Sequence, residues 1–178
     1  MGDILEQLGK KKSTGLDTMK KLWLFLGAIV ASALTMIFLP MLGEFASTFV
    51  LVLIAVYVYI LYVQVTRINV EYEYTFSDGI LDVDTIYGKQ KRKRMVSINC
   101  REMELMAWSK NPEHREKFFD ESVKKQYRAV FDSKAGGVYR ILFRENGEKV
   151  FLSFQPNEAF LDAIKKTKPS CVFLEQNL

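Results

Sequence analysis

Two long apolar runs near the N-terminus dominate the hydrophobic pattern of the chain. They cover residues 22–39 and 46–65, and neither contains a charged side chain. About 20 apolar residues are enough for a helix to cross roughly 30 Å of hydrocarbon. Pro40 and Gly43 interrupt the helical pattern between the runs. We therefore predict a transmembrane α-helical hairpin over residues 22–65, with a tight turn at one membrane face.

Lysines and arginines beside the two runs set the expected orientation. Residues 1–21 form a basic tail, the turn at 40–45 carries no Lys or Arg, and Arg67 follows the second run. Because short basic segments stay on the cytoplasmic side, both termini are expected in the cytoplasm of a two-pass plasma-membrane protein. A cleaved signal peptide is the alternative for the first run, but that run is long for such a peptide and a second span follows it.

Two features of the N-terminal part leave alternatives open. Ile4, Leu5 and Leu8 have helical spacing and precede a lysine triplet, which fits either a short interfacial helix on anionic lipid or a frayed tail. Small residues such as Gly27 and Ala31 could pack against the second span or against another copy of the chain. A homo-oligomer is therefore one candidate assembly.

From residue 70 onward the pattern changes to alternation of apolar and polar residues, which is typical of half-buried strands. Residues 109–125 lose this alternation and predict a long polar loop with a short helix around Phe118 and Phe119. Turns are expected at 77–79, at 135–137 and at the Asn-Gly pair 146–147. The predicted strands are 70–76, 80–87, 95–100, 103–107, 127–131, 138–144 and 150–154.

The chain closes with an amphipathic helix. Pro156 suits a first helical position, Phe160 and Ile164 belong to an apolar stripe, and Pro169 stops the helix. About seven short antiparallel strands plus one helix predict an α+β domain over residues 66–178, in which the helix covers the open end of the sheet.

Composition agrees with a membrane hairpin joined to one folded domain. Hydrophobic residues make up 49% of the 178 residues, charged residues 26%, and the net charge is +4. These values exclude a disordered or collagen-like chain.

Three stretches of this pattern resemble the pleckstrin-homology-like (PH-like) superfold, in its bacterial versions that follow membrane spans. They are residues 74–81, 92–98 and 139–166. The whole chain is similar to a family of small Gram-positive membrane proteins with two N-terminal transmembrane helices and a PH-like cytoplasmic domain. The resemblance implies an antiparallel β-sandwich or partly open barrel capped by the C-terminal helix. Since this superfold hosts lipid binding, peptide binding and scaffolding, it implies no single activity.

The densest charge cluster lies in the predicted connection between the second and third strands of the domain. Its members are Lys89, Lys91, Arg92, Lys93 and Arg94. Such a cluster near the inner leaflet would attract anionic headgroups, so these five residues are the candidate lipid-binding site. The alternative is a solvated hairpin without a ligand. Nucleic acid is not expected, because no aromatic residues are interleaved with the basic ones.

Signals for catalysis or metal binding are poor. His114 lies in a polar segment where solvent exposure is expected, and Cys100 and Cys171 have neither a C-x-x-C spacing nor a histidine nearby. Both cysteines are expected to be reduced thiols. The carboxylates of residues 71, 73, 82 and 84 are expected on the exposed sheet face. We predict no catalytic residue, metal or cofactor.

The sequence therefore favours a non-enzymatic, membrane-anchored PH-like module that presents a protein-interaction or scaffolding surface at the cytoplasmic face. The exposed face of the hairpins and residues 109–125 are expected to contact a membrane or cytoplasmic protein partner. The alternative is a sensor or binder of anionic lipid headgroups that uses the basic cluster at 89–94.

Overall fold

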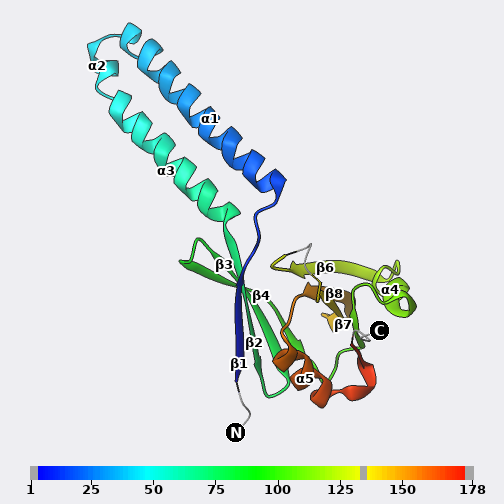
Figure 1. The fold of residues 1–178 in the computed structure, drawn as a ribbon. Helices are drawn as coiled ribbons and strands as arrows, with labels where there is room; N and C mark the ends of the chain where they lie inside the picture. The colour runs from blue at the N-terminus through cyan, green and yellow to red at the C-terminus, as the bar shows by residue number, and fades with distance from the viewer. Residues whose placement is uncertain (1–3, 133–135, 175–178) are drawn as a thin grey trace. The chain divides into compact units, whose positions relative to one another are not determined.

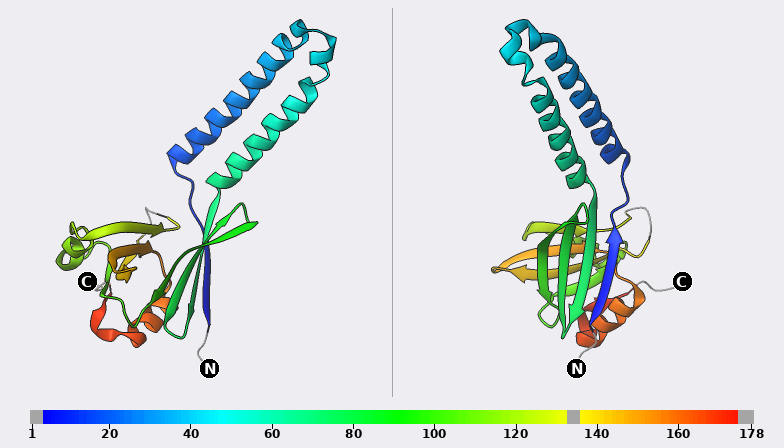
Figure 2. Two further views of the ribbon diagram at one scale, coloured as in Figure 1. Left: turned by 180° about the vertical axis from the view of Figure 1, so that it is seen from behind. Right: turned by 90° about the vertical axis from the view of Figure 1, so that its left-hand side faces the viewer.

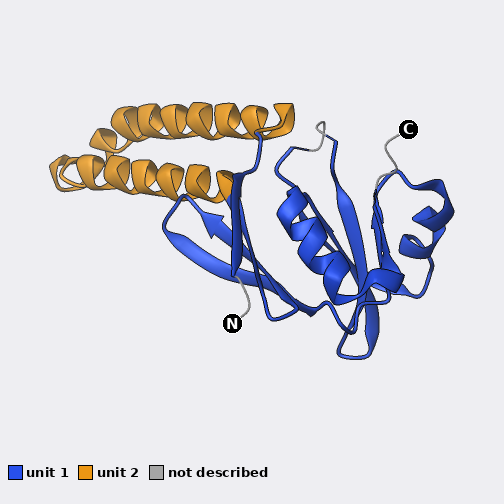
Figure 3. Cartoon of the chain, turned by 60° about the horizontal axis from the view of Figure 1, so that its bottom comes forward, with its two compact units in different colours: residues 1–12, 71–178 blue, residues 13–70 orange. Residues whose placement is uncertain are grey.

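The computed structural model describes residues 4–132 and 136–174. The chain divides into two compact units, which Figure 3 shows in different colours. Residues 13–70 form one unit, and the chain on either side of them forms the other. The expected turn at 135–137 and the last residues of the predicted domain, 175–178, lie partly or wholly outside the described residues.

The unit of residues 13–70 is a helical hairpin (Figure 1). It contains α1 (Gly15–Phe38), η1 (Pro40–Leu42), α2 (Glu44–Ser47) and α3 (Val50–Ile68). Thr14 caps α1 through a capping box, in which its hydroxyl accepts from Asp17 N and its own N–H donates to the Asp17 carboxylate. The Thr35 and Tyr57 hydroxyls lie 3.2 Å apart and join α1 to α3.

Neither long helix of this unit has a buried residue, although both are largely apolar. Leu22 is 64% exposed and Leu51 is 79% exposed. The segments Gly15–Leu42 and Glu44–Ile68 are each long and apolar enough to cross a membrane. Two helices thus lie where the two apolar runs predicted them, and many of their large apolar side chains are exposed.

The other unit begins with a four-stranded sheet, named sheet A, whose strands lie side by side in Figure 2. Its order is β1 (Leu5–Lys10), β2 (Val70–Ser77), β3 (Ile80–Tyr87) and β4 (Lys91–Asn99). Asp78 and Gly79 have φ values of 52° and 84° in the turn between β2 and β3. This confirms the tight turn predicted there, since both residue types tolerate positive φ.

The N-terminal tail is a strand, so both earlier interpretations, an interfacial helix and a frayed tail, are wrong. Residues 5–10 pair antiparallel with β2, with Leu5 opposite Phe76. The Gln7 side chain donates to the Gln155 carbonyl (3.0 Å) and accepts from the Asn157 N–H (2.8 Å). Pairing and side-chain bridging together replace the hydrogen bonds that a tail would otherwise make with water.

The remaining strands form sheet B, in the order β6-β8-β7-β5-β9. They are β5 (Leu105–Trp108), β6 (Val123–Ala129), β7 (Tyr139–Glu145), β8 (Glu148–Phe154) and β9 (Val172–Phe173). The described residues thus contain nine strands rather than about seven. Two pairs, β6 with β8 and β5 with β9, are parallel, which corrects the purely antiparallel expectation. The Asn146-Gly147 turn between β7 and β8 is confirmed, with φ values of 52° and 85°.

Two helices belong to the sheet unit. The first, α4 (Pro112–Phe118), starts after the Asn111 cap and lies inside the predicted polar loop. The second, α5 (Glu158–Thr167), starts after the Asn157 cap, so Pro156 precedes the helix rather than opening it. Asn caps are favoured because the side-chain oxygen accepts an otherwise unpaired helical N–H.

The main core lies where β2, β8 and α5 meet around Tyr74, which has no exposed surface. Its ring lies 5.7 Å from the Phe154 ring, 6.3 Å from the Phe160 ring and 4.9 Å from the Phe131 ring. Phe160 and Ile164 are buried, as the apolar stripe predicted. The helix therefore packs its apolar side on the aromatic end of the sheets.

Candidate functional site

The basic cluster occupies one tight turn and the start of β4. Lys89 lies in the turn with φ of 62°, and Gln90 N donates to the Tyr87 carbonyl. The other four residues, from Lys91 to Arg94, belong to β4 and pair with β3. The prediction that the whole cluster lies in a connection is therefore wrong for these four, because the strand pairing extends almost to the turn.

Strand alternation divides these four residues between the two faces of sheet A. Arg94 lies opposite Asp84, and Lys93 lies opposite Thr85. Thr85 is buried on the side of β3 that carries the core residues. Because successive side chains point to opposite faces, the two arginines share the outer face and Lys91 and Lys93 share the inner one.

The two arginines of the cluster form ion pairs with three carboxylates. Arg92 Nη2 lies 2.5 Å from Glu73 Oε2, and Arg94 Nη2 lies 3.0 Å from Asp82 Oδ2. Asp84 lies between them, 4.0 Å from Arg92 Nε and 3.6 Å from Arg94 Nε. The Glu73 and Asp84 side chains are each only 14% exposed, which corrects the expectation of open carboxylates. The guanidinium groups cover these acids, whose charges would otherwise be poorly solvated.

A β-bulge makes this pairing possible. Val83 lies opposite Val96, but the next residue of β3, Asp84, lies opposite Arg94. The residue skipped on β4 is Met95. A bulge of this kind re-aims the side chains that follow it, and here it aligns an arginine rather than a methionine with the carboxylate.

Three lysines of the cluster keep their charge available. Lys89, Lys91 and Lys93 are exposed, and within residues 4–132 and 136–174 the structure gives their side chains no ion pair or hydrogen bond. The five-residue cluster is therefore two compensated arginines and three uncompensated lysines. Only the lysines offer an anion a positive charge that no carboxylate has neutralised.

The residues with reactive side chains are not brought together. His114 packs against Phe173, with 4.1 Å between ring centroids, and neither ring nitrogen has a hydrogen-bond partner, so its expected solvent exposure is wrong. Cys100 is buried and burial raises its pKa to about 12, which keeps the thiol neutral. Cys171 is partly exposed and also free. Within the described part of the chain, no three His, Cys, Asp or Glu side chains group as metal ligands would.

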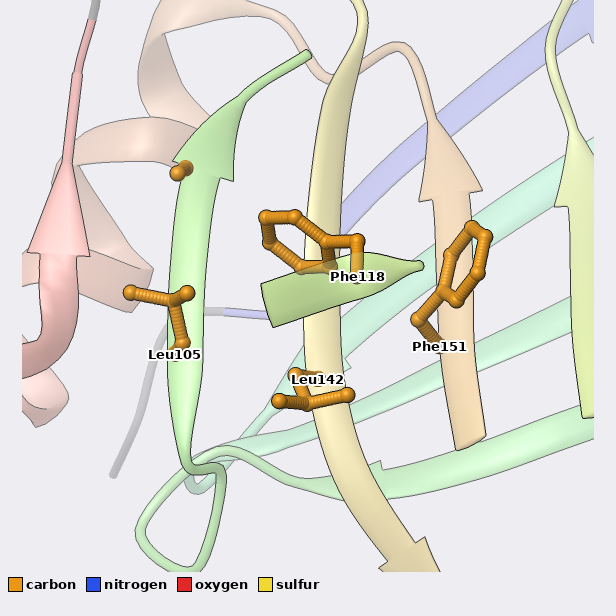
Figure 4. Packing of buried hydrophobic residues seen from close by; sticks show 5 residues of the cluster. Leu105, Phe118, Leu142 and Phe151 are labelled. Carbon is orange, nitrogen blue, oxygen red and sulfur yellow. The ribbon is translucent and has the colours of Figure 1, made fainter. Parts of the chain in front are cut away.

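A second surface lies where α4 meets β6. Figure 4 shows Phe118 over Leu105, Leu142 and Phe151, with which it forms a small apolar cluster. The neighbouring Phe119 is 57% exposed. Beside it lies an open hollow of about 250 Å³, lined by Phe118, Phe119 and Phe151 and by polar residues of β6. The sequence pointed to residues 109–125 as a contact region, but not to a hollow, because β8 contributes part of its wall.

Comparison with known proteins identifies the chain at the level of a family. No curated protein and no solved structure matches it. The family described as "Bacterial PH-like domain (DUF6106)" matches residues 4–174. This match includes β1 and the helical hairpin as well as both sheets. The chain therefore belongs to the bacterial PH-like domain family.

Proposed function

We propose that the protein is a non-enzymatic module, anchored in the plasma membrane by α1 and α3, that binds a partner protein at the cytoplasmic face. The observation that carries this proposal is the pair of apolar helices without buried residues. Neither apolar run contains Asp, Glu, Lys, Arg or His. Since ion pathways and proton relays depend on such groups, the hairpin acts as an anchor rather than as a transporter.

The hollow beside Phe119 is the proposed contact surface for the partner. An exposed phenylalanine next to a concave apolar surface is typical of interaction sites, since aromatic anchors contribute most to binding energy. β6 pairs only with β8 among the described residues, so its other edge can accept an extended segment. Lys124, an exposed residue of this edge strand, discourages self-association through like-charge repulsion.

Photo-crosslinking in native membranes tests this proposal. A photoreactive amino acid replaces exposed Lys124 in the full chain, and adducts are identified by mass spectrometry. We expect one reproducible protein adduct that disappears with F119A and persists with F173A, an exposed phenylalanine on β9. Absence of a reproducible adduct, or equal loss in both variants, would refute the proposed surface.

The second candidate function is binding of anionic lipid headgroups by the basic cluster. The three uncompensated lysines favour it, since a lysine within a Debye length of an anionic surface contributes about 1 kcal/mol. The arginines are less suited, because their charges are already compensated.

Lysine labelling on the full chain in nanodiscs tests the lipid alternative. The full chain is needed because a fragment starting at residue 66 would lack β1. We expect acetylation of Lys89, Lys91 and Lys93 to slow several-fold when phosphatidylglycerol replaces phosphatidylcholine, and salt to restore the rate. Lys117 in α4 and Lys166 in α5 are controls in the same molecule. Equal labelling rates in both lipids would exclude headgroup binding by these lysines.

A further inference from the structure

One end of the helical hairpin carries an open hollow of about 470 Å³ between its two long helices. The first part of α1 contributes Lys20, Trp23 and Leu24, and the end of α3 contributes Gln64, Arg67 and Ile68. In each helix the three residues have the spacing i, i+3, i+4, which places them on one face. The two faces meet across the hollow because α1 and α3 lie side by side (Figure 1).

The two cations of this hollow have no partner of opposite charge. Lys20 and Arg67 are exposed, and within the described part of the chain the structure gives neither side chain an ion pair or a hydrogen bond. Among the described residues, the lining of the hollow holds no Asp or Glu. The neighbouring Lys21 differs, because its Nζ donates to the Asn69 side chain at 2.7 Å. The hollow therefore presents two uncompensated positive charges to whatever fills it.

An apolar groove of about 250 Å³ continues from this hollow along the two helices. Trp23 and Leu24 line both, and the rest of the groove is lined by Gly27, Ala28 and Ala31 of α1 and by Tyr57, Ile60 and Leu61 of α3. An added Cβ at Gly27 would meet nothing within 4 Å, so α3 does not fill the groove at this point. From Leu24 to Ala31 the groove follows α1 for about 10 Å, which is less than the roughly 15 Å of hydrocarbon in one leaflet.

We propose that the hollow and the groove together bind one anionic phospholipid, with its phosphate between Lys20 and Arg67 and one acyl chain along the groove. The proposal rests on the proposed function only in requiring that α1 and α3 lie in a membrane. Both cations donate charge-assisted hydrogen bonds to phosphate, and basic pockets between helix ends bind anionic headgroups. Trp23 is 65% exposed between the two parts of the site, and its ring suits the boundary between headgroup and acyl chain.

Charge decides against a second copy of the chain as the occupant. In a symmetric pair of hairpins packed on this face, each copy would bring its own Lys20 and Arg67 to the same interface. These cations would repel one another strongly at the low dielectric constant of a membrane interior. A phospholipid instead supplies both a negative charge for the hollow and an apolar chain for the groove.

Quenching of Trp23 fluorescence by brominated lipids tests this site in the full chain. Trp23 and Trp108 are the two tryptophans, so W108F leaves one fluorophore, and it lies in the proposed site. The vesicles contain phosphatidylglycerol and phosphatidylcholine in varied ratio, with bromine on the acyl chains of one lipid at a time. We expect phosphatidylglycerol to associate beside Trp23 about tenfold more strongly than phosphatidylcholine, and high salt to reduce this preference.

Substitutions in the W108F background locate the preference. K20Q and R67Q should each lower it several-fold, because each removes one cation from the hollow. K21Q is the matched control, since it removes the same charge from the next residue, whose Nζ binds Asn69. It should leave the preference unchanged, and equal losses in K20Q and K21Q would overturn the proposal. G27L fills the groove and should also lower the preference, whereas no effect of G27L would contradict the place of the acyl chain.

Recovery of the protein with the vesicles after an alkaline carbonate wash reports anchoring independently of this site. Anchored protein without a preference for phosphatidylglycerol would overturn the lipid site and leave the proposed anchor intact. Loss of the protein from the vesicles would contradict the anchor, and the lipid site with it. Weak quenching by both lipids in anchored protein would show that protein covers Trp23, and would assign the groove to another copy of the chain.

Discussion

At the scale of single residues, the Tyr74 hydroxyl joins β2 to the end of β6 and to the residue that follows β8. It donates to the Ala129 carbonyl and accepts from Gln155 N–H at 3.2 Å. We expect Y74F to lower the free energy of unfolding of this unit by about 1–3 kcal/mol, because it leaves a buried carbonyl and N–H without a partner. Hydrogen exchange of core amides in the full chain measures the change. Y87F, for which the structure gives no hydroxyl hydrogen bond within the described residues, should change it by less than about 0.5 kcal/mol.

We expect the buried Cys100 thiol to make the folded sheet unit less stable at alkaline pH. Burial raises its pKa from 9.0 to about 12, so the folded state keeps a proton that the unfolded state releases. The contribution of this thiol to the free energy of unfolding is complete below pH 9 and is lost as the pH rises toward 12. The free energy of unfolding then falls by at most about 1.4 kcal/mol per pH unit. C100A should show a shallower decline of the free energy of unfolding between pH 8 and about 10. Identical slopes would show that this thiol does not contribute.

Position 9 requires a glycine because the Phe131 ring lies close to its main chain. A Cβ at this position would overlap the Phe131 side chain, which stacks on Tyr74. We expect G9A to destabilise the sheet unit by about 1–3 kcal/mol, because an overpacked core must shift. Gly136, where an added Cβ meets nothing within 4 Å, supplies the control variant G136A. Thermal unfolding of the two variants side by side distinguishes steric overlap from a general effect of replacing glycine.

At the scale of elements, β1 is held in place by the Gln7 side chain as well as by its pairing with β2. Gln7 joins β1 to the segment that leads into α5 through its hydrogen bonds to Gln155 and Asn157. We expect Q7A to lower the free energy of unfolding by about 1–3 kcal/mol, because two main-chain groups lose their partner. E6A alters the exposed neighbour on the same strand and should stay within about 0.5 kcal/mol. Faster hydrogen exchange at Asn157 only in Q7A would locate the effect.

The pattern of apolar and polar residues predicts some of the strands but not others. β2, β3, β7 and β8 follow clear alternation between turns with Asp-Gly or Asn-Gly, so they could be predicted. β1 could not, because its inward residues are Leu5, Gln7 and Gly9, and only one of them is apolar. β6 starts within an apparently polar segment, because it is an edge strand with many exposed residues.

The candidate sites needed information that no local pattern carries. The basic cluster was visible in the sequence, but its division into compensated arginines and free lysines follows from the bulge opposite Asp84. The hollow beside Phe119 has a wall residue on β8, Phe151, which is distant in the sequence from the phenylalanines at 118 and 119. Long-range register therefore determines both sites, and alternation along one strand cannot supply it.

At the scale of the whole molecule, the proposed topology follows from charge and hydropathy and is open to direct test. The turn between α1 and α3 has no Lys or Arg, whereas lysines precede α1. In a C171S background, we expect E44C to react with a membrane-impermeant maleimide in intact cells, and K11C to react only after lysis, since basic segments stay inside. Cys100 is buried and should stay unlabelled in folded protein. Labelling of K11C from outside would reverse the orientation and place the PH-like sheets, with both candidate sites, on the other side of the membrane.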